Sequence, residues 1–304
     1  MNKVALSIDI EDWYHGPAVI GSSFSKYKTI NDFEKENDFE FHKLNKYIQR
    51  ILEILKTYDV KATFFIIGDL ANRYPEIVTS IIKDKHEIGC HGMYHYSKYD
   101  PAEDKMRYPA DEFKEMTLAS KKILEDQSGQ QVNGYRAPGA YVCGEMIDIL
   151  EDCGFSYDSS VCVNSIYKKS GGSLRGVDTK PYTPKKGSLE KNNENNERTI
   201  LEFPWSYYKL FNFKFPTAGG PFLRFFGSTY ISRGIKQSLK RGHTGFYSHA
   251  IDISEEEFPQ LGKHRPFYFL IKGKMVEKRL IRLIKKFKDQ ISTYQEILNE
   301  INVS

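Results

Sequence analysis

The pattern that decides the fold starts with the segment Val4-Ala5-Leu6-Ser7-Ile8-Asp9-Ile10, which is followed directly by Glu11-Asp12-Trp13. The first run is short and rich in aliphatic residues, which predicts a buried strand. Where this strand ends, the carboxylates of Asp9, Glu11 and Asp12 gather. Carboxylates this close together repel one another unless a cation or solvent offsets their charge. The segment therefore predicts either an active site or an exposed acidic turn.

Six further segments along the chain have the same β-rich character and alternate with helical patterns. The predicted strands are residues 4–10, 61–68, 86–91, 132–138, 155–161, 199–206 and 244–253. Helical patterns fall on residues 44–55, on a segment that begins near Pro75, and on residues 113–124 and 145–153. This alternation predicts parallel βα units, and it fits a doubly wound sheet and a barrel equally well.

The composition indicates a single globular domain over residues 1–304, because 40% hydrophobic and 14% aromatic residues are enough for a large core. A polar stretch at 184–198 predicts a surface loop. With 44 basic and 40 acidic residues, the formal charge of +4 gives no reason to expect a nucleic-acid partner. The four cysteines form no C-x-x-C pair, which favours reduced thiols.

Three other polar clusters follow predicted strands. His91 and His95 form an H-x-x-x-H pair, whose spacing lets two imidazoles reach one metal ion. Arg136 stands just before a Pro138-Gly139 turn and is able to keep a nearby carboxylate ionised. His249 ends an apolar strand, where parallel α/β folds place their chemistry. Each cluster taken alone also fits a purely structural role.

Taken together and in this order, the clusters resemble the motifs of the polysaccharide deacetylases, carbohydrate esterase family four. The resemblance covers roughly residues 4–253, and several ordered motifs are more specific than one. It implies an irregular (β/α) barrel of about seven parallel strands and a hydrolase that removes acetyl groups from N-acetylated sugars. The matching segments are Ser7-Ile8-Asp9, Ala62-Thr63-Phe64-Phe65, residues 86–91 with His95, Arg136-Ala137-Pro138, residues 154–160 and Phe246-Tyr247-Ser248-His249.

The first motif departs from the commonest family form, in which two adjacent aspartates serve as base and metal ligand. Here Asp9 matches the base, but either Glu11 or Asp12 can match the ligand. We favour Glu11, because side chains two residues apart share one face of a strand. Arg136 is followed by Ala137-Pro138-Gly139 rather than by an aromatic residue after the proline, which would open the substrate cleft.

The resemblance also implies a metal site. A divalent ion, with Zn²⁺ as the first choice, would be held by His91, His95 and one carboxylate, that of Glu11 or Asp12. Such an ion acidifies water and polarises a carbonyl group.

The remaining roles follow from the same resemblance. Asp9 would be the general base, kept ionised by Arg136, and the backbone N–H of Gly139 would help to stabilise the oxyanion. His249 would protonate the departing amine, and Asp158 would orient it. The other histidines considered for this role are His243 and His264.

The substrate predicted from the sequence is a lipid- or nucleotide-linked N-acetylated precursor of a surface polysaccharide. Residues 1–10 show no export signal, so we expect a cytoplasmic protein, at or near the inner face of the membrane. Within a C-terminal helical segment at 274–302, the basic amphipathic residues 278–288 either contact anionic lipid or, as we favour, cover the barrel with a solvated basic face. Two alternatives remain: an amidohydrolase that acts on a cyclic ureide or imide, and a non-catalytic sugar-binding protein.

Overall fold

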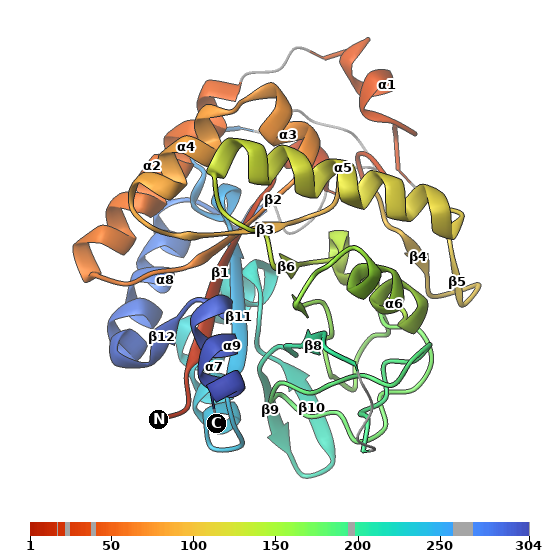
Figure 1. Ribbon diagram of the computed structural model, residues 1–304. Helices are drawn as coiled ribbons and strands as arrows, with labels where there is room; N and C mark the ends of the chain where they lie inside the picture. Colours follow the sequence, from red (N-terminus) through yellow and green to blue (C-terminus); the bar gives the residue numbers. More distant parts are fainter. Residues whose placement is uncertain (17, 22–24, 38–40, 194–197, 258–269, 304) are drawn as a thin grey trace.

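The computed structural model describes residues 1–16, 18–21, 25–37, 41–193, 198–257 and 270–303, and it is built around one sheet (Figure 1). Every strand pair in this sheet is parallel. The strand order is β11 (Thr244–His249), β1 (Val4–Ile10), β2 (Thr63–Ile66), β3 (Glu87–Cys90), β6 (Gly134–Tyr135), β7 (Tyr157–Asp158) and β8 (Leu201–Glu202), and β12 (Ile291–Ser292) also pairs with β1.

Each predicted β segment contains one of these strands, but the strands on one side of the sheet are much shorter than predicted. For residues 132–138, only Gly134 and Tyr135 form β6. The chain then turns through the 3-10 helix η2 (Pro138–Ala140), because Pro138 has no N–H to donate to a neighbouring strand. His264, considered above, lies outside the described residues.

The sheet curls into a half-barrel rather than lying open, as the resemblance implied. Just after β8, Trp205 forms an isolated parallel bridge with Gly245 on β11, so the two ends of the strand order approach each other. The N–H of Ser206 also donates to the carbonyl of Gly245 at 3.0 Å. A doubly wound sheet has helices on both faces, whereas here one face is wrapped around an interior filled by side chains.

Alternation along β1 separates the two sides of the barrel wall. Val4, Leu6, Ile8 and Ile10 pack into the main hydrophobic core shared with the helices. Ala5 belongs to a second cluster inside the barrel, which includes Phe65, Tyr157, Phe203 and Tyr294. Because successive side chains of a strand point to opposite faces, Ser7 and Asp9 point inward like Ala5.

Helices cover the outer face of the sheet, with α2 to α5 lying together on one side (Figure 1). The helices are α1 (Ile30–Glu34), α2 (Phe41–Tyr58), α3 (Gly68–Arg73), α4 (Glu76–Lys83), α5 (Ala110–Ser128), α6 (Gly144–Asp152), α7 (Gly220–Leu239), α8 (Lys274–Phe287) and α9 (Tyr294–Val303), with short 3-10 turns η1 (Trp13–His15), η3 (Ala250–Ile253) and η6 (Lys288–Gln290). Two antiparallel pairs stand outside the sheet, β4 (Tyr99–Asp100) with β5 (Lys105–Met106), and β9 (Tyr207–Leu210) with β10 (Phe213–Pro216).

The basic segment near the C-terminus forms α8, and its apolar side chains are buried against the rest of the protein. This face is therefore already covered, as expected for a helix that packs on a barrel. Among the described residues, no helix combines the length and the apolar character that a membrane crossing requires.

Two carboxyl groups inside the fold, those of Asp158 and Glu202, form a buried pair. Burial raises the pKa of both, and the Asp158 charge raises the pKa of Glu202 further. The Glu202 carboxyl also accepts the N–H groups of Ser160 and Val161 at 3.2 and 2.9 Å. The folded protein therefore keeps a proton on this pair up to a higher pH than the unfolded chain does.

We predict that Glu202→Gln makes the stability less dependent on pH. The pKa of Glu202 is higher in the folded state than in the unfolded state, so the folded protein loses stability as pH rises from about 4.5 towards the folded-state pKa. For one proton this loss is about 1.4 kcal/mol per pH unit. Glutamine cannot titrate but can donate its N–H to Asp158. Denaturant unfolding between about pH 4.5 and 8 should show a steeper loss for the wild type than for the variant. The exposed Glu145→Gln is the control, and parallel curves for wild type and Glu202→Gln would contradict this assignment.

Candidate metal and catalytic site

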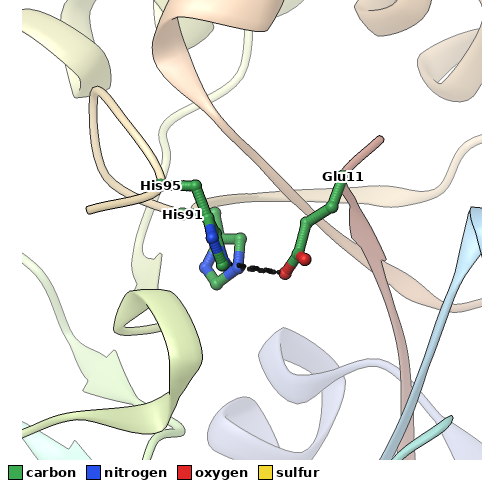
Figure 2. Close-up of side chains that lie close together, drawn as sticks. All are labelled: Glu11, His91 and His95. Atoms are coloured by element: carbon green, nitrogen blue, oxygen red, sulfur yellow. Dashed lines mark hydrogen bonds and ion pairs between the residues drawn. The ribbon is translucent and has the colours of Figure 1, made fainter. Parts of the chain in front are cut away.

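A carboxylate and two imidazoles converge at the carboxyl end of the central strands. Glu11 follows β1, and His91 and His95 follow β3, the second neighbour of β1 in the sheet. Figure 2 shows both rings pointing at the carboxylate. The Oε1 atom of Glu11 lies 2.9 Å from Nε2 of His91 and 3.0 Å from Nε2 of His95. All three side chains are buried.

The second nitrogen of each ring identifies its tautomer. Nδ1 of His91 lies 2.8 Å from the carbonyl oxygen of Arg136, and Nδ1 of His95 lies 2.7 Å from that of His15. A carbonyl only accepts, so each Nδ1 carries the proton and donates it. In the neutral rings, both Nε2 atoms then present lone pairs to a carboxylate oxygen. Oε1 of Glu11 and the Nε2 atoms of His91 and His95 are thus three acceptors that face one another with no donor hydrogen between them, an arrangement that fits a bound cation.

The charge state of Glu11 agrees with a ligand role. Burial raises the pKa of Glu11, but positive charge on the neighbouring imidazoles, His95 first and then His249, outweighs that effect and holds the pKa well below its ordinary value. A cation held between neutral rings would supply that positive charge in their place. An ionised carboxylate with two neutral imidazoles is a usual donor set for Zn²⁺.

Asp12 does not join this cluster. Its side chain accepts the backbone N–H of Trp13 at 2.7 Å and caps η1, while its own backbone N–H donates to Nδ1 of His15. Burial raises its pKa to about 6. Among the described residues, the groups close enough to hold one ion are Glu11 with His91 and His95, and Glu11 with Asp9 and His249. The arrangement thus brings Glu11, and not Asp12, to the two histidines.

Asp9 and Arg136 form a buried ion pair beside this cluster. Nη1 of Arg136 lies 2.7 Å from Oδ1 of Asp9. The guanidinium also donates to Ser7, Ser159 and Tyr294 at 2.7 to 3.0 Å. Burial lowers the pKa of Arg136, but Asp9 outweighs this effect, and the pKa is raised overall. Every part of the guanidinium is thus held in place.

His249 ends β11 and lies 3.9 Å from Glu11, measured from Nε2 to Oε1. Its Nδ1 lies 3.3 Å from the nearer oxygen of Asp252, whose carboxylate also accepts the backbone N–H of His249. Burial lowers the pKa of His249, but the charges of Asp252 and Glu11 raise it to about 9. Asp252 is in turn paired with the buried Arg224.

The expectation that Asp158 orients His249 is wrong. Asp158 lies on β7, several strands away from β11, where it accepts the hydroxyl of Ser160 and pairs with Glu202. The partner of His249 is Asp252, three residues further along the chain. The sequence did contain a signal for this pairing. A carboxylate three residues after the N-cap residue of a helical turn often accepts the backbone N–H of that N-cap residue, as Asp252 does for His249.

His243 also lies away from the cluster, at the opposite end of β11. Its Nδ1 accepts the backbone N–H of Lys3 at 3.1 Å. It does not line the pocket described next.

One pocket of about 320 Å³ joins these groups. The predicted site residues that line it are Asp9, Glu11, His91, His95, Arg136, Gly139 and His249. Gly139 adopts a left-handed φ of 63°, which its lack of a side chain permits. Sequence reasoning gave no role to several other residues of the lining. Tyr247 stands inside the final histidine motif, whereas Tyr141, Lys169, Trp205 and Arg224 come from distant segments without a motif.

Two family profiles match separate parts of the chain. Residues 29–157 match the polysaccharide deacetylase profile, and residues 165–297 match a domain of unknown function, DUF3473. Over residues 29–157, the chain is therefore similar to the polysaccharide deacetylases. Asp9 and Glu11 precede the first matched segment, and His249 falls in the second. Both matched segments contribute strands to the same sheet.

The similarity to curated proteins is partial. A peptidoglycan deacetylase of Helicobacter pylori is 28% identical over 134 residues, which cover 43% of each chain. A peptidoglycan-N-acetylglucosamine deacetylase of Bacillus cereus is 28% identical over 109 residues, 36% of this chain and 47% of that protein. The chain thus spans less than half the length of either relative.

Solved structures share the fold over nearly the whole chain. A Mycobacterium smegmatis protein assigned to the polysaccharide deacetylases has a TM-score of 0.60 at 18% identity, covering 100% of this chain and 92% of that one. Puue allantoinase has a TM-score of 0.58 at 15% identity, covering 99% and 90%. A CE4 family pseudoenzyme from Bacillus anthracis has 0.53 at 15%, covering 98% and 65%. At these identities the likeness concerns the fold.

We predict that the purified protein binds about one divalent ion per chain and that the His91→Ala, His95→Ala double variant does not. The isosteric pair Glu11→Gln and Asp12→Asn separates the two carboxylates. Glu11→Gln should lower zinc affinity more than a hundredfold, because it removes a ligand, and Asp12→Asn less than about tenfold. Competition with a chromophoric chelator measures both. Circular dichroism verifies folding, and a larger loss for Asp12→Asn would give the ligand role to Asp12.

Proposed function

We propose that this protein is a metal-dependent hydrolase that removes the acetyl group from an N-acetylated sugar. The observation that carries the proposal is the convergence of Glu11, His91 and His95 on one point, with three acceptor atoms and no donor between them. The named activities of the curated relatives support the reaction class. The cation most consistent with this donor set is Zn²⁺.

When bound there, the cation supplies Lewis acidity, which lowers the pKa of water and polarises an acetyl carbonyl group. Asp9 lines the same pocket and accepts the proton of the attacking water. Nη1 of Arg136, 2.7 Å from Oδ1 of Asp9, holds this carboxylate in position. The backbone N–H of Gly139 contributes to stabilising the oxyanion.

His249 donates a proton to the departing amine. A general acid must be protonated before it acts, and the raised pKa of about 9 keeps the imidazole charged at neutral pH. Asp252 is the positioning residue, because it bonds both the ring and the backbone of His249. The proposed base Asp9 and the proposed acid His249 thus line one pocket.

For the biological substrate, we propose a lipid- or nucleotide-linked precursor of a surface polysaccharide, processed in the cytoplasm near the inner face of the membrane. This places the protein in an intracellular branch of the family. The motif order and the similarity to named deacetylases support the reaction class, and the location is a proposal that the following experiment tests. Fractionation of cells that produce the full-length protein, followed by immunoblotting, tests the location, and protein found outside the cell would contradict it.

We predict that Asp9→Asn lowers turnover by about a hundredfold or more and leaves the metal content largely unchanged. The variant retains a side chain of the same shape beside Arg136, but it loses the group that accepts a proton. Acetate release from N-acetylglucosamine oligosaccharides and elemental analysis measure the two properties. Unchanged turnover would remove Asp9 from the mechanism.

We further predict that His249→Ala is less harmful when an acetate ester replaces the amide, because an alkoxide needs less help from an acid than an amine does. Asp9→Asn should gain no such relief, since both substrates require an activated water. Matched N-acetyl and O-acetyl sugars provide the comparison, and His243→Ala, at the far end of β11, is the control. An equal deficit of His249→Ala on both substrates would mean that it positions the substrate instead.

A further inference from the structure

One lysine belongs to the pocket without any part in the proposed chemistry. Lys169 lines the same cavity as Glu11 and His249. Its Nζ donates to the carbonyl of Gly139 at 2.8 Å and lies 5.3 and 5.8 Å from the ring centres of Tyr141 and Tyr167. The ammonium group therefore forms part of the pocket wall against which the substrate would bind.

The backbone holds this lysine firmly against that wall. Val142 and Ser170 form a parallel β-bridge, and the N–H of Gly171 donates to the carbonyl of Val142 at 2.8 Å. The segment that carries Lys169 is thus attached to the segment that follows Gly139. A long side chain fixed at its base and at its tip loses less entropy when it binds a ligand.

Among the described residues, the other two buried cations of the pocket have a carboxylate partner, whereas Lys169 does not. Asp9 is paired with Arg136, and Asp252 with Arg224. In the described part of the chain, Lys169 has no ion-pair partner, and its described hydrogen bond is to a neutral carbonyl. Burial lowers its pKa, whereas the Cys162 thiol and the Glu11 carboxylate oppose that shift. A half-buried cation with a neutral partner is costly and is stabilised by an anion supplied from outside.

We propose that Lys169 is a specificity-determining residue that selects an N-acetylated sugar carrying an anionic group, a carboxylate or a phosphate, near its acetamide. Two of its three N–H donors remain for that group beside the bond to Gly139. The proposal rests on the proposed function for the identity of the sugar. The partly exposed ring of Tyr141 in the same lining supplies an aromatic surface for a sugar ring.

The test compares three sugars that differ in charge: N-acetylglucosamine, its C6 carboxylic acid and its 1-phosphate. Binding to the zinc-loaded full-length protein is measured by ligand-observed NMR, and acetate release is measured separately. At least one anionic sugar should bind about tenfold more tightly than the neutral sugar, with the difference shrinking as salt is raised. Comparison of the acid with the phosphate tells which anion is preferred.

Substitutions at Lys169 and at its neighbour Lys168 test whether Lys169 causes the preference for an anionic sugar. Lys169→Met should lose most of the preference for the anion, whereas Lys169→Arg, which keeps the charge, should retain it. Lys168→Met is the matched control, since Lys168 is exposed and does not line the pocket. It should leave both binding and turnover unchanged.

The outcomes separate this inference from the proposed function. Equal binding of all three sugars, no binding of either anion, or a preference that survives in Lys169→Met would overturn the role of Lys169. A charge preference in binding without acetate release from any of the sugars would support Lys169 and count against the deacetylase activity.

Discussion

The ion pair between Arg136 and Asp9 is the interaction on which the rest of the site depends. It lies inside the barrel, where removing either partner leaves an uncompensated buried charge at a cost of about 3–5 kcal/mol. The barrel meets this constraint by surrounding the guanidinium with acceptors from Ser7, Ser159 and Tyr294. Strands far apart in the sequence must therefore close around one side chain, which links the formation of the fold to the ionisation of Asp9.

The parallel barrel also explains why the metal cluster forms at the same place. Since all the strands run in one direction, the residues that follow them meet at one rim. The alternation along β1 points Asp9 inward, and Glu11 follows two residues later at the rim. The carbonyl of Arg136 then lies 2.8 Å from Nδ1 of His91, so the residue that pairs with Asp9 also fixes the tautomer of one imidazole.

The sequence was sufficient for the parts of the protein that follow local rules. Apolar runs in the sequence predicted each of the strands β11, β1, β2, β3, β6, β7 and β8, because a strand buried in a sheet needs apolar side chains. The juxtaposition of Asp9, Glu11, His91, His95 and Arg136 agrees with the motifs, although their chemical roles remain proposals. Asp252 was missed because residues 244–253 were predicted as one strand, whereas the strand ends at His249 and the turn η3 brings the Asp252 carboxylate back to the His249 ring. Lys169 and Arg224 stand in segments without a motif, and only the tertiary fold brings them into the pocket.

The pocket gives the proposed base and the proposed acid each its own buried partner of opposite charge. Arg136 lies beside Asp9, and Asp252 lies beside His249, where its charge raises the pKa of the imidazole. Each counter-ion is itself fixed by further partners, Asp252 by Arg224 and Arg136 by the barrel interior. Proton transfer from water to Asp9 and from His249 to the amine would leave both groups neutral, and the unmatched Arg136 and Asp252 then favour the return of both charges for the next cycle.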